Sequence, residues 1–291
     1  MYITNEFDPL KKVIVSYGES VPHFKDYRNN CPDFLKFHSL KKPWDESLLL
    51  RQQRIFFEAL EKYEVELFFA KIVKGLPWQM YTRDMGFVYK NKFFYSKSTT
   101  LMERENEFES IAEILSSLDS KEVVKIEKGK IEGGDVLTDD EELYIGISNR
   151  TTIEGVKNVE KHFPVKTLCL GEDVMHLDTR MAILPGRKLL IYLRAFQEPD
   201  LRFLQKRFEF LPVTESEARR LGTNVFIINP QTIVVAKSHT RIIRVLKDNG
   251  FQIEELDYSE PIILGGSFRC STLPVERSSG VRSECGVMEN G

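Results

Sequence analysis

Helical and strand-like segments alternate along this chain of 291 residues. Five stretches place apolar residues at helical spacing among charged ones, and a short apolar run typical of a strand follows each. The helical stretches are residues 46–63, 104–118, 153–163, 198–208 and 239–249, and the strand-like runs are Val65–Phe69, Val123–Ile126, Val165–Leu168, Leu211–Val213 and Phe251–Ile253. These units begin roughly 40 to 60 residues apart, a period found in repeats arranged radially or in a row. The pattern predicts an α/β protein of five related units, with an irregular α/β domain as the alternative.

Further apolar runs predict additional strands between these units. They are Lys12–Ser16, Gly86–Tyr89, Phe93–Tyr95, Leu143–Ile147, Ala182–Leu184, Leu189–Tyr192, Val225–Ile228 and Ile233–Ala236. The pair Asn249-Gly250 predicts the end of the last helix, because both residues tolerate the left-handed conformation. No Pro-, Gly- or Ser-rich linker divides the sequence, so we expect one domain over residues 1–291.

The composition is typical of a globular protein in water, with 42% hydrophobic and 29% charged residues and a net charge of −3. Acidic and basic residues are mixed, and no basic stripe suggests a nucleic-acid partner. No apolar run approaches the roughly 18 residues that span a bilayer. The segment Met1–Glu6 has neither the basic nor the apolar region of a signal peptide. We therefore expect a cytoplasmic protein that binds neither nucleic acid nor a membrane.

Four cysteines are present, Cys31, Cys169, Cys270 and Cys285. Because no CxxC pair occurs, a metal site is not expected, and a reducing compartment disfavours disulfides. Cys169 lies in the apolar run Thr167–Leu170 and is expected to be a buried, unreactive strand thiol. Cys31 and Cys285 lie in polar segments and have no expected role.

The setting of Cys270 favours reactivity. It follows Gly265-Gly266, which permits a tight turn and a close approach of the backbone to a ligand. A core strand rarely holds two consecutive glycines. Arg269 directly precedes the thiol, and a nearby cation stabilises a thiolate. Cys270 is therefore a candidate nucleophile, and the alternative is a buried structural thiol.

A second candidate for chemistry is His176, in the polar cluster Met175–Asp178. Imidazole titrates near pH 7, so His176 can act as a general acid or base. The alternative is a hydrogen-bonded structural histidine. If this segment is a strand, His176 and Asp178 point to the same side, because positions i and i+2 share a face.

Carboxylates mark two further polar clusters. Glu132 and Asp135 flank a glycine pair, for which a plain β-turn is the alternative. Asp84 follows Arg83, for which a local ion pair is the alternative. Several carboxylates suit a guanidinium group, a planar cation rich in N–H donors that carboxylates bind in bidentate fashion. A thiolate can attack its carbon while histidine protonates the departing amine.

Five motifs, in this order, resemble the guanidino-modifying or pentein superfamily, which includes arginine deiminases, dimethylarginine dimethylaminohydrolases and amidinotransferases. They are Arg83–Gly86, Glu132–Asp135, Gly146–Thr151, His176–Asp178 and Gly265–Thr272. The resemblance implies an α/β fold, a five-bladed propeller with pseudo-fivefold repeats of ββαβ type. It also implies a small guanidino substrate and neither cofactor nor metal, and it leaves a homodimer open.

The resemblance further implies a role for each reacting residue. Cys270 becomes the nucleophile and His176 the general acid and base. Glu132 would orient that histidine and hold one guanidine nitrogen. The implied reaction is hydrolysis of the guanidino C–N bond of arginine or a substituted arginine. It passes through a covalent thiouronium intermediate and gives citrulline plus ammonia or an alkylamine.

Other residues are implied to bind the substrate. Asp84 and Asp178 would hold the remaining guanidine nitrogens. Arg150 would bind the substrate α-carboxylate, and Arg104 is a second candidate for that role. Asp135 is expected to support the glycine turn.

Some features of the sequence differ among the members of this superfamily and bear on the identity of the substrate. Asp178 favours an unmethylated guanidine, since dimethylarginine hydrolases usually lack an acid there. Methyl groups would leave this acid unpaired, at a cost of roughly 1–3 kcal/mol. Glu132 favours a hydrolase because amidinotransferases tend to carry aspartate, and the chain length resembles that of dimethylarginine hydrolases. Two alternatives stay open, an amidinotransferase acting on an amine acceptor and a non-catalytic guanidine-binding protein.

Overall fold

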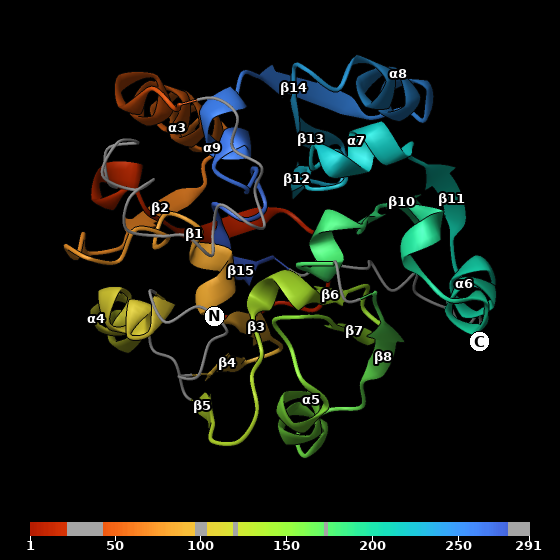
Figure 1. Ribbon diagram of the computed structural model, residues 1–291, viewed down its shortest axis with the longest axis horizontal. Coiled ribbons are helices and arrows are strands. Elements are labelled where there is room, and N and C mark those ends of the chain that lie inside the picture. Colours follow the sequence, from red (N-terminus) through yellow and green to blue (C-terminus); the bar gives the residue numbers. More distant parts are fainter. Residues whose placement is uncertain (22–42, 97–103, 119–121, 172–173, 279–291) are drawn as a thin grey trace, which may run out of the picture.

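In the computed structural model of the protein, the described residues contain five sheets of three strands each, which lie around the middle of the molecule (Figure 1). The structure describes residues 1–21, 43–96, 104–118, 122–171 and 174–278. The strands are β1 (Leu10–Val15), β2 (Glu66–Phe69), β3 (Phe87–Tyr89), β4 (Lys92–Ser96), β5 (Glu122–Ile126), β6 (Val136–Thr138), β7 (Leu143–Ile147), β8 (Lys166–Cys169), β9 (Met181–Leu184), β10 (Lys188–Ile191), β11 (Glu209–Pro212), β12 (Phe226–Asn229), β13 (Thr232–Ala236), β14 (Gln252–Leu256) and β15 (Leu273–Arg277).

One helix of each unit lies at the rim in Figure 1, outside its sheet. These helices are α3 (Glu46–Glu61), α4 (Ala112–Ser117), α5 (Ile153–Glu160), α6 (Glu198–Gln205) and α8 (Thr240–Asp248). Two shorter helices, α7 (Glu215–Arg219) and α9 (Ser259–Ile263), precede β12 and β15. The described residues also form short 3₁₀ helices, which are η1 (Gly18–Ser20), η2 (Thr82–Met85), η4 (Glu107–Ser110), η5 (Gly133–Asp135), η6 (Leu177–Thr179) and η7 (Leu193–Ala195).

The sheets share one pairing pattern. In the sheet β3-β4-β5, the first two strands are antiparallel, and the third returns parallel to the second after α4. The sheets β6-β7-β8, β9-β10-β11 and β12-β13-β14 repeat this order around α5, α6 and α8. The pattern agrees with the five related units expected from the sequence.

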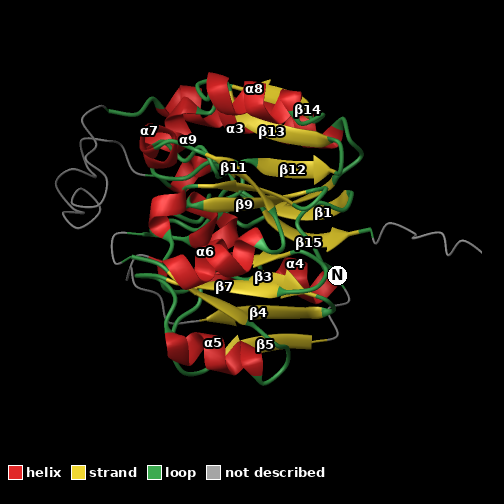
Figure 2. Ribbon diagram, turned by 90° about the vertical axis from the view of Figure 1, so that its right-hand side faces the viewer, coloured by secondary structure: helices red, strands yellow, loops and turns green. Residues whose placement is uncertain are grey.

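The remaining sheet combines both ends of the described chain. β15 pairs antiparallel with β1, and β1 pairs parallel with β2 after α3. Its strand order is therefore also ββαβ, but the first strand comes from the C-terminal side of the sequence. Figure 2 shows the strands of the different sheets running in similar directions, mainly along the viewing direction of Figure 1.

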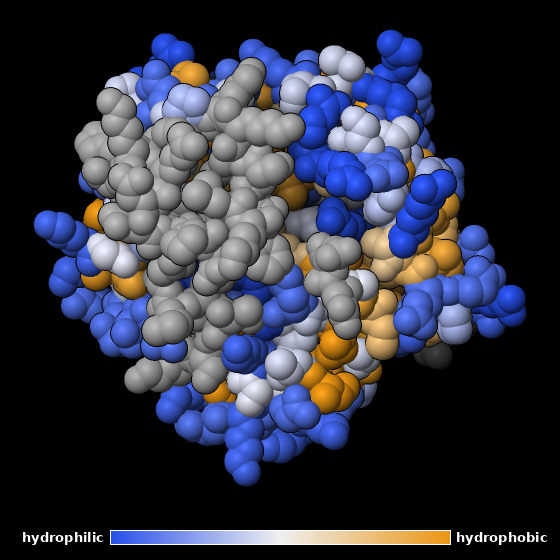
Figure 3. Space-filling view, in the orientation of Figure 1, coloured by the Kyte–Doolittle hydropathy of each residue, from blue (hydrophilic) through white to orange (hydrophobic). Residues whose placement is uncertain are grey.

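Apolar side chains fill the spaces between neighbouring sheets. One buried cluster joins Leu184 and Leu190 of one sheet to Ile227 and Ile233 of the next, and Ile242 of α8 covers it. Strands that pack on both faces read as nearly continuous apolar runs, which is why the sequence marks most of them clearly. Hydrophilic residues predominate along the rim of the face in Figure 3. None of the helices in the described part of the chain combines the length and apolar character needed to cross a bilayer.

Every strand predicted from an apolar run is present, whereas β6 and β15 were not predicted. The helix expected over residues 104–118 is broken into η4 and α4, and Asn106 before η4 has a left-handed backbone (φ 72°). The predicted helix end at Asn249-Gly250 is confirmed, with Gly250 at φ 87°.

Candidate active site

The predicted site residues come from turns that precede the first strands of their units. Asp84 lies in η2 before β3, and Glu132 directly precedes η5 and β6. His176 and Asp178 lie at η6 before β9, and Cys270 lies three residues before Leu273, the first residue of β15. Because these units share one pairing pattern, equivalent turns bring residues up to 186 positions apart to one place.

Cys270 and His176 line the same small cavity, of about 20 Å³. Its walls are Trp78, Tyr81, Asp84, Arg104, Arg150, Met175, His176, Leu264, Gly265, Gly266 and Cys270. The candidate nucleophile and the candidate acid therefore share one space, as the sequence predicted. Asp178 and Glu132 are not part of this wall, although both are buried beside it.

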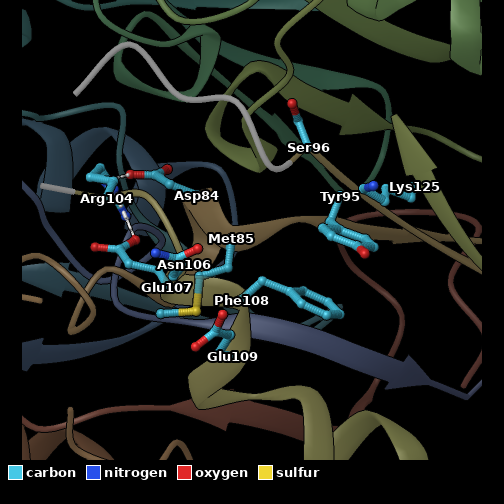
Figure 4. A pocket seen from close by; sticks show the side chains of 10 residues that line it. All are labelled: Asp84, Met85, Tyr95, Ser96, Arg104, Asn106, Glu107, Phe108, Glu109 and Lys125. Atoms are coloured by element: carbon cyan, nitrogen blue, oxygen red, sulfur yellow. Dashed lines mark hydrogen bonds and ion pairs between the residues drawn. The ribbon is translucent and has the colours of Figure 1, made fainter. Parts of the chain in front are cut away.

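A larger cavity of about 280 Å³ lies on the other side of Asp84 and Arg104, and Figure 4 shows its lining. Its aromatic wall is Tyr95 and Phe108, whose rings are stacked with centroids 3.8 Å apart. It contains neither Cys270 nor His176. We place the chemistry in the smaller cavity because only that cavity holds a nucleophile and a base together.

His176 and Glu132 form a buried pair. Nε2 of His176 lies 2.8 Å from Oε2 of Glu132, and Nδ1 lies 3.7 Å from Oδ1 of Asp84. Burial disfavours the imidazolium, but Asp84, Glu132 and Asp135 outweigh it and raise the pKa of His176 to about 9. Burial also disfavours the carboxylate, yet Arg150 and His176 hold the pKa of Glu132 at about 2. The pair is therefore charged at neutral pH.

The acids around the cavity keep oxygen atoms free of hydrogen-bond partners. Among the described residues, Oδ1 of Asp84, Oε1 of Glu132 and Oδ1 of Asp178 are buried and accept no hydrogen bond. Nδ1 of His176 is also buried without such a partner. Buried polar atoms are nearly always paired in folded proteins, so three such oxygens indicate a place for a ligand rich in N–H donors.

Cys270 is almost fully buried, at 2% exposure. Its backbone N–H donates to Oδ1 of Asn224 at 3.2 Å. Burial, together with Asp178 and Asp84, raises the pKa of the thiol well above its usual value. Arg269 lowers this pKa, as expected from the sequence, but its effect is the smaller one. Burial and the two acids thus favour the neutral thiol in the free protein, against the effect of Arg269 alone.

Asp178 does not lie on a strand with His176, so that prediction is wrong. His176 is extended (φ −142°, ψ 156°), and Asp178 belongs to the 3₁₀ turn that follows. Oδ2 of Asp178 accepts a hydrogen bond from Nη1 of Arg269 at 2.7 Å. Asp178 thus acts on the cavity through its charge and its unpartnered oxygen.

The two arginines predicted to bind a carboxylate differ in their contacts. Nη1 of Arg150 lies 3.4 Å from Oε2 of Glu132 at the cavity wall. Arg104 is held at three places, by Asp84 at 2.6 Å, by Glu107 at 2.7 Å and by the carbonyl of Tyr81 at 3.1 Å. Figure 4 shows the first two of these contacts. The ion pair of Asp84 is therefore with Arg104.

Two residues without an assigned role in the sequence analysis also shape the site. The hydroxyl of Tyr81 donates to the carbonyl of Pro261 at 2.7 Å and accepts from the N–H of Gly266 at 3.1 Å. A Cβ on Gly266 would lie 2.3 Å from the Tyr81 ring, so this position requires glycine. Tyr81 lies two residues before the motif Arg83–Gly86, whereas Asn224 follows Thr223 in a segment with no motif.

Gly134 is likewise required beside His176, because a side chain at this position would collide with the imidazole ring. A Cβ there would lie 2.7 Å from Cγ of His176 and 3.0 Å from Oδ1 of Asp84. Asp135 is fully buried and accepts from the N–H of Leu177 and the hydroxyl of Ser148. It thereby joins two of the turns, in the supporting position expected from the sequence.

Metal-ligating atoms gather at one place in the described part of the chain. Asp84, Glu132 and His176 each offer one atom, all within 4.8 Å of one another. The expectation of a metal-free protein rested on cysteine spacing and on the family resemblance, and cysteine spacing does not bear on this group. The prediction that Cys169 is buried is wrong, since it ends β8 with an exposed side chain. Cys31 and Cys285 lie outside the described residues.

Similarity to known proteins agrees with this geometry. Residues 70–210 match the arginine deiminase family. The chain is 37% identical to the uncharacterized protein YkgA of Bacillus subtilis (strain 168), over 94% of each chain. It is 25% identical to an N(G),N(G)-dimethylarginine dimethylaminohydrolase of Pseudomonas aeruginosa, over 83% of this chain and 93% of the relative.

A solved structure shows the same fold. The N-terminal domain of ArgZ, an arginine dihydrolase from the ornithine-ammonia cycle in cyanobacteria, superposes with a TM-score of 0.81 and 20% identity, over 93% of this chain and 98% of that domain. Fold and sequence together define an α/β protein related to enzymes that act on guanidino groups. The chain belongs to the guanidino-group-modifying (pentein) superfamily.

Proposed function

We propose that the protein is a cysteine-dependent hydrolase of the guanidino C–N bond of arginine or a substituted arginine. The observation that carries this proposal is the set of three buried carboxylate oxygens without partners beside Cys270 and His176. A guanidinium supplies five N–H donors in one plane and a permanent positive charge. It therefore offers a hydrogen bond to each free oxygen of Asp84, Glu132 and Asp178.

Substrate charge explains how a neutral thiol becomes a nucleophile. In the free protein, Asp178 and Asp84 raise the pKa of Cys270. A bound guanidinium places a positive charge between these acids and the sulfur, which favours the thiolate. Binding of the cation and loss of the thiol proton to solvent are thus coupled, since His176 already carries its own proton.

The first half of the reaction forms a covalent intermediate. The Cys270 sulfur adds to the guanidinium carbon, and the imidazolium of His176 gives its proton to the departing nitrogen. The C–N bond then breaks and releases ammonia or an alkylamine, which leaves a thiouronium on Cys270. The high pKa of His176, about 9, keeps this proton available at neutral pH.

Water completes the cycle. Neutral His176 takes a proton from a water molecule, whose oxygen adds to the thiouronium carbon. The C–S bond breaks, the sulfur leaves as thiolate, and the hydroxyl proton on the former guanidino carbon passes to solvent as the ureido product citrulline forms. Glu132 holds the imidazole through its 2.8 Å contact in both halves and keeps the ring aimed at the cavity.

Relatives and site residues suggest the substrate class. The named relatives are a dimethylarginine hydrolase and an arginine dihydrolase, so we propose a free amino acid with a terminal guanidine. Arg150, at the cavity wall, is the proposed partner of its carboxylate. Arg104 can serve this carboxylate only by giving up a contact to Asp84, Glu107 or Tyr81. Asp178 favours the unmethylated guanidine.

The proposal also concerns how the five sheets are arranged. We propose that the five sheets are the blades of a closed five-bladed propeller and form one catalytic domain, because each apolar cluster joins neighbouring sheets. The pairing of β15 with β1 would then join the ends of the ring.

A mass-spectrometric assay tests the function. The protein is incubated with arginine, monomethylarginine or asymmetric dimethylarginine, and citrulline, the released amine and the intact protein mass are measured. We expect citrulline from at least one substrate and, after acid quench, an amidino adduct on the peptide that contains Cys270. Absence of both product and adduct with all three compounds would contradict the proposal.

A further inference from the structure

Three arginines are buried together behind the Cys270 turn. Arg83, Arg269 and Arg277 are exposed by only 5%, 3% and 4%. They come from η2, from the residue before Cys270 and from the end of β15. The carboxylates that act on these arginines are Glu6 and Asp178 and, for Arg277, also Asp8.

Glu6 and Asp178 both form their ion pairs with the same arginine. Arg269 binds Asp178 at 2.7 Å and Glu6 at 3.0 Å. In the described part of the chain, neither Arg83 nor Arg277 has a carboxylate oxygen within ion-pair distance. Among the residues that the structure describes, Arg277 donates only to the carbonyls of Asp8 and Ile227.

Arg83 has still fewer partners. Its Nε donates a long hydrogen bond, 3.4 Å, to the carbonyl of Arg269, and its Nη2 is buried with no partner among the described residues. Arg269 takes both carboxylates that lie within ion-pair distance, so Arg83 and Arg277 have no counter-charge in direct contact among the described residues. Burial of a charge without a counter-charge is costly, and arginine does not escape this cost by losing its proton.

Burial and the neighbouring Arg269 lower the pKa of Arg83 to about 9. Burial also lowers the pKa of Arg277, to about 10, where Glu6 opposes the effect and Arg269 adds to it. A lowered pKa is expected for a buried guanidinium with no carboxylate in direct contact, which agrees with the contacts of Arg83 and Arg277.

Both arginines line one small cavity. Its volume is about 10 Å³, and its wall includes Arg83, Arg277, Glu6, Asn5 and Thr138. A cavity of this size holds roughly one water-sized particle, which is too little for phosphate or sulfate. The Glu6 carboxylate in this wall is already held by Arg269.

We propose that Arg83 and Arg277 bind one small monovalent anion, of the size of chloride, in this cavity. The anion supplies the missing negative charge and accepts the free N–H of Arg83. This site is separate from the proposed guanidine site and does not rest on the proposed function, because Arg83 faces away from Asp84 toward Arg269.

The anion site also contacts the turn that carries the nucleophile. The backbone N–H of Arg83 donates to the carbonyl of Cys270 at 3.1 Å, and its side chain donates to the carbonyl of Arg269. Occupancy therefore stabilises the Arg269–Cys270 segment, so we expect halides to stabilise the whole protein.

Thermal unfolding tests the proposal. The midpoint is measured in sodium chloride and in sodium gluconate at equal ionic strength, because gluconate is too large for the cavity. At a chloride concentration ten times the dissociation constant, we expect a midpoint higher by about 2–4 °C. Arg83→Met should remove this difference, whereas the control Arg219→Met, at an exposed arginine, should keep it.

A crystal soaked in bromide provides a second measurement that needs no variant. We expect an anomalous peak between the guanidinium groups of Arg83 and Arg277. Equal midpoints in chloride and gluconate, a chloride effect that persists in Arg83→Met, or bromide found only at other places would each overturn the proposal.

Discussion

Nε2 of His176 lies 2.8 Å from Oε2 of Glu132, and both side chains are nearly inaccessible to solvent. This contact has a consequence for stability, since it helps to raise the pKa of His176 to about 9 against the opposing effect of burial. In an unfolded chain, histidine titrates near 6.5. The stabilisation is therefore fully present below pH 6.5 and is lost as pH rises through 9.

We predict that the free energy of unfolding falls by roughly 3 kcal/mol between pH 6.5 and pH 9.5, relative to His176→Asn. Urea titrations of both proteins across this range measure the difference. Parallel pH profiles for the two proteins would show that the imidazole is not charged in the folded state.

Replacement of the nucleophile should separate activity from folding. In Cys270→Ser we expect citrulline formation to fall by about a thousandfold or more, because a hydroxyl is far less nucleophilic than a thiolate. The thermal midpoint should stay close to that of the unchanged protein, since the two side chains are similar in size. Cys169→Ser, at the exposed thiol, is the matched control and should keep full activity. Turnover retained by Cys270→Ser would remove the residue from its proposed role.

Gly134→Ala should disable the site through geometry alone. The new methyl group would lie 2.7 Å from the His176 ring, so the imidazole must move away from Asp84. We expect a loss of kcat of about a hundredfold, the order of effect produced by a 1 Å misplacement. Gly171→Ala is the control, because a Cβ at that position meets no atom within 4 Å. Equal rates for the two variants would show that the position of His176 is not critical.

Substrate preference should reflect the unpartnered oxygen of Asp178. Two methyl groups on one guanidine nitrogen remove the N–H donors that this oxygen needs, at a cost of about 1–3 kcal/mol. We therefore expect kcat/KM for arginine to exceed that for asymmetric dimethylarginine by about 5- to 150-fold. Steady-state assays with both compounds measure the ratio. A preference for the methylated compound would mean that Asp178 does not contact that nitrogen.

Water should be the acceptor of the amidino group. With isotopically labelled arginine and added glycine or lysine, we expect the label in citrulline and none on the added amine. Mass spectrometry separates these products. A labelled guanidino derivative of the amine would identify an amidinotransferase instead, whereas tight arginine binding with neither product would favour a non-catalytic binding protein.

The sequence predicted those strands and helices that a short run of apolar residues is enough to reveal. The run Leu143–Ile147 is apolar and almost entirely buried, and it was recognised as a strand. β15 was missed because Leu273–Arg277 contains a proline and two charged residues, and β6 because it spans three residues after a glycine turn. The helix α9 spans five residues and contains Pro261, so helical periodicity could not reveal it.

Motifs identified the residues of the site but not their partners. Arg83 and Asp84 are neighbours in sequence, yet Asp84 binds Arg104, 20 positions away, and Arg83 faces Arg269, 186 positions away. Asp178 and Glu6 meet Arg269 across separations of 91 and 263 positions. Such contacts are set by the arrangement of the sheets. For the same reason, the opposing effects of burial, Asp178 and Asp84 on the pKa of Cys270 could not be inferred from the adjacent arginine.

The pairing of β15 with β1 places β1 in the middle of its sheet, between β15 and β2. Removal of β15 would leave one edge of β1 unpaired, and an exposed strand edge can pair with other chains. Loss of this strand is therefore expected to promote aggregation, and it would also remove the segment that follows the proposed nucleophile.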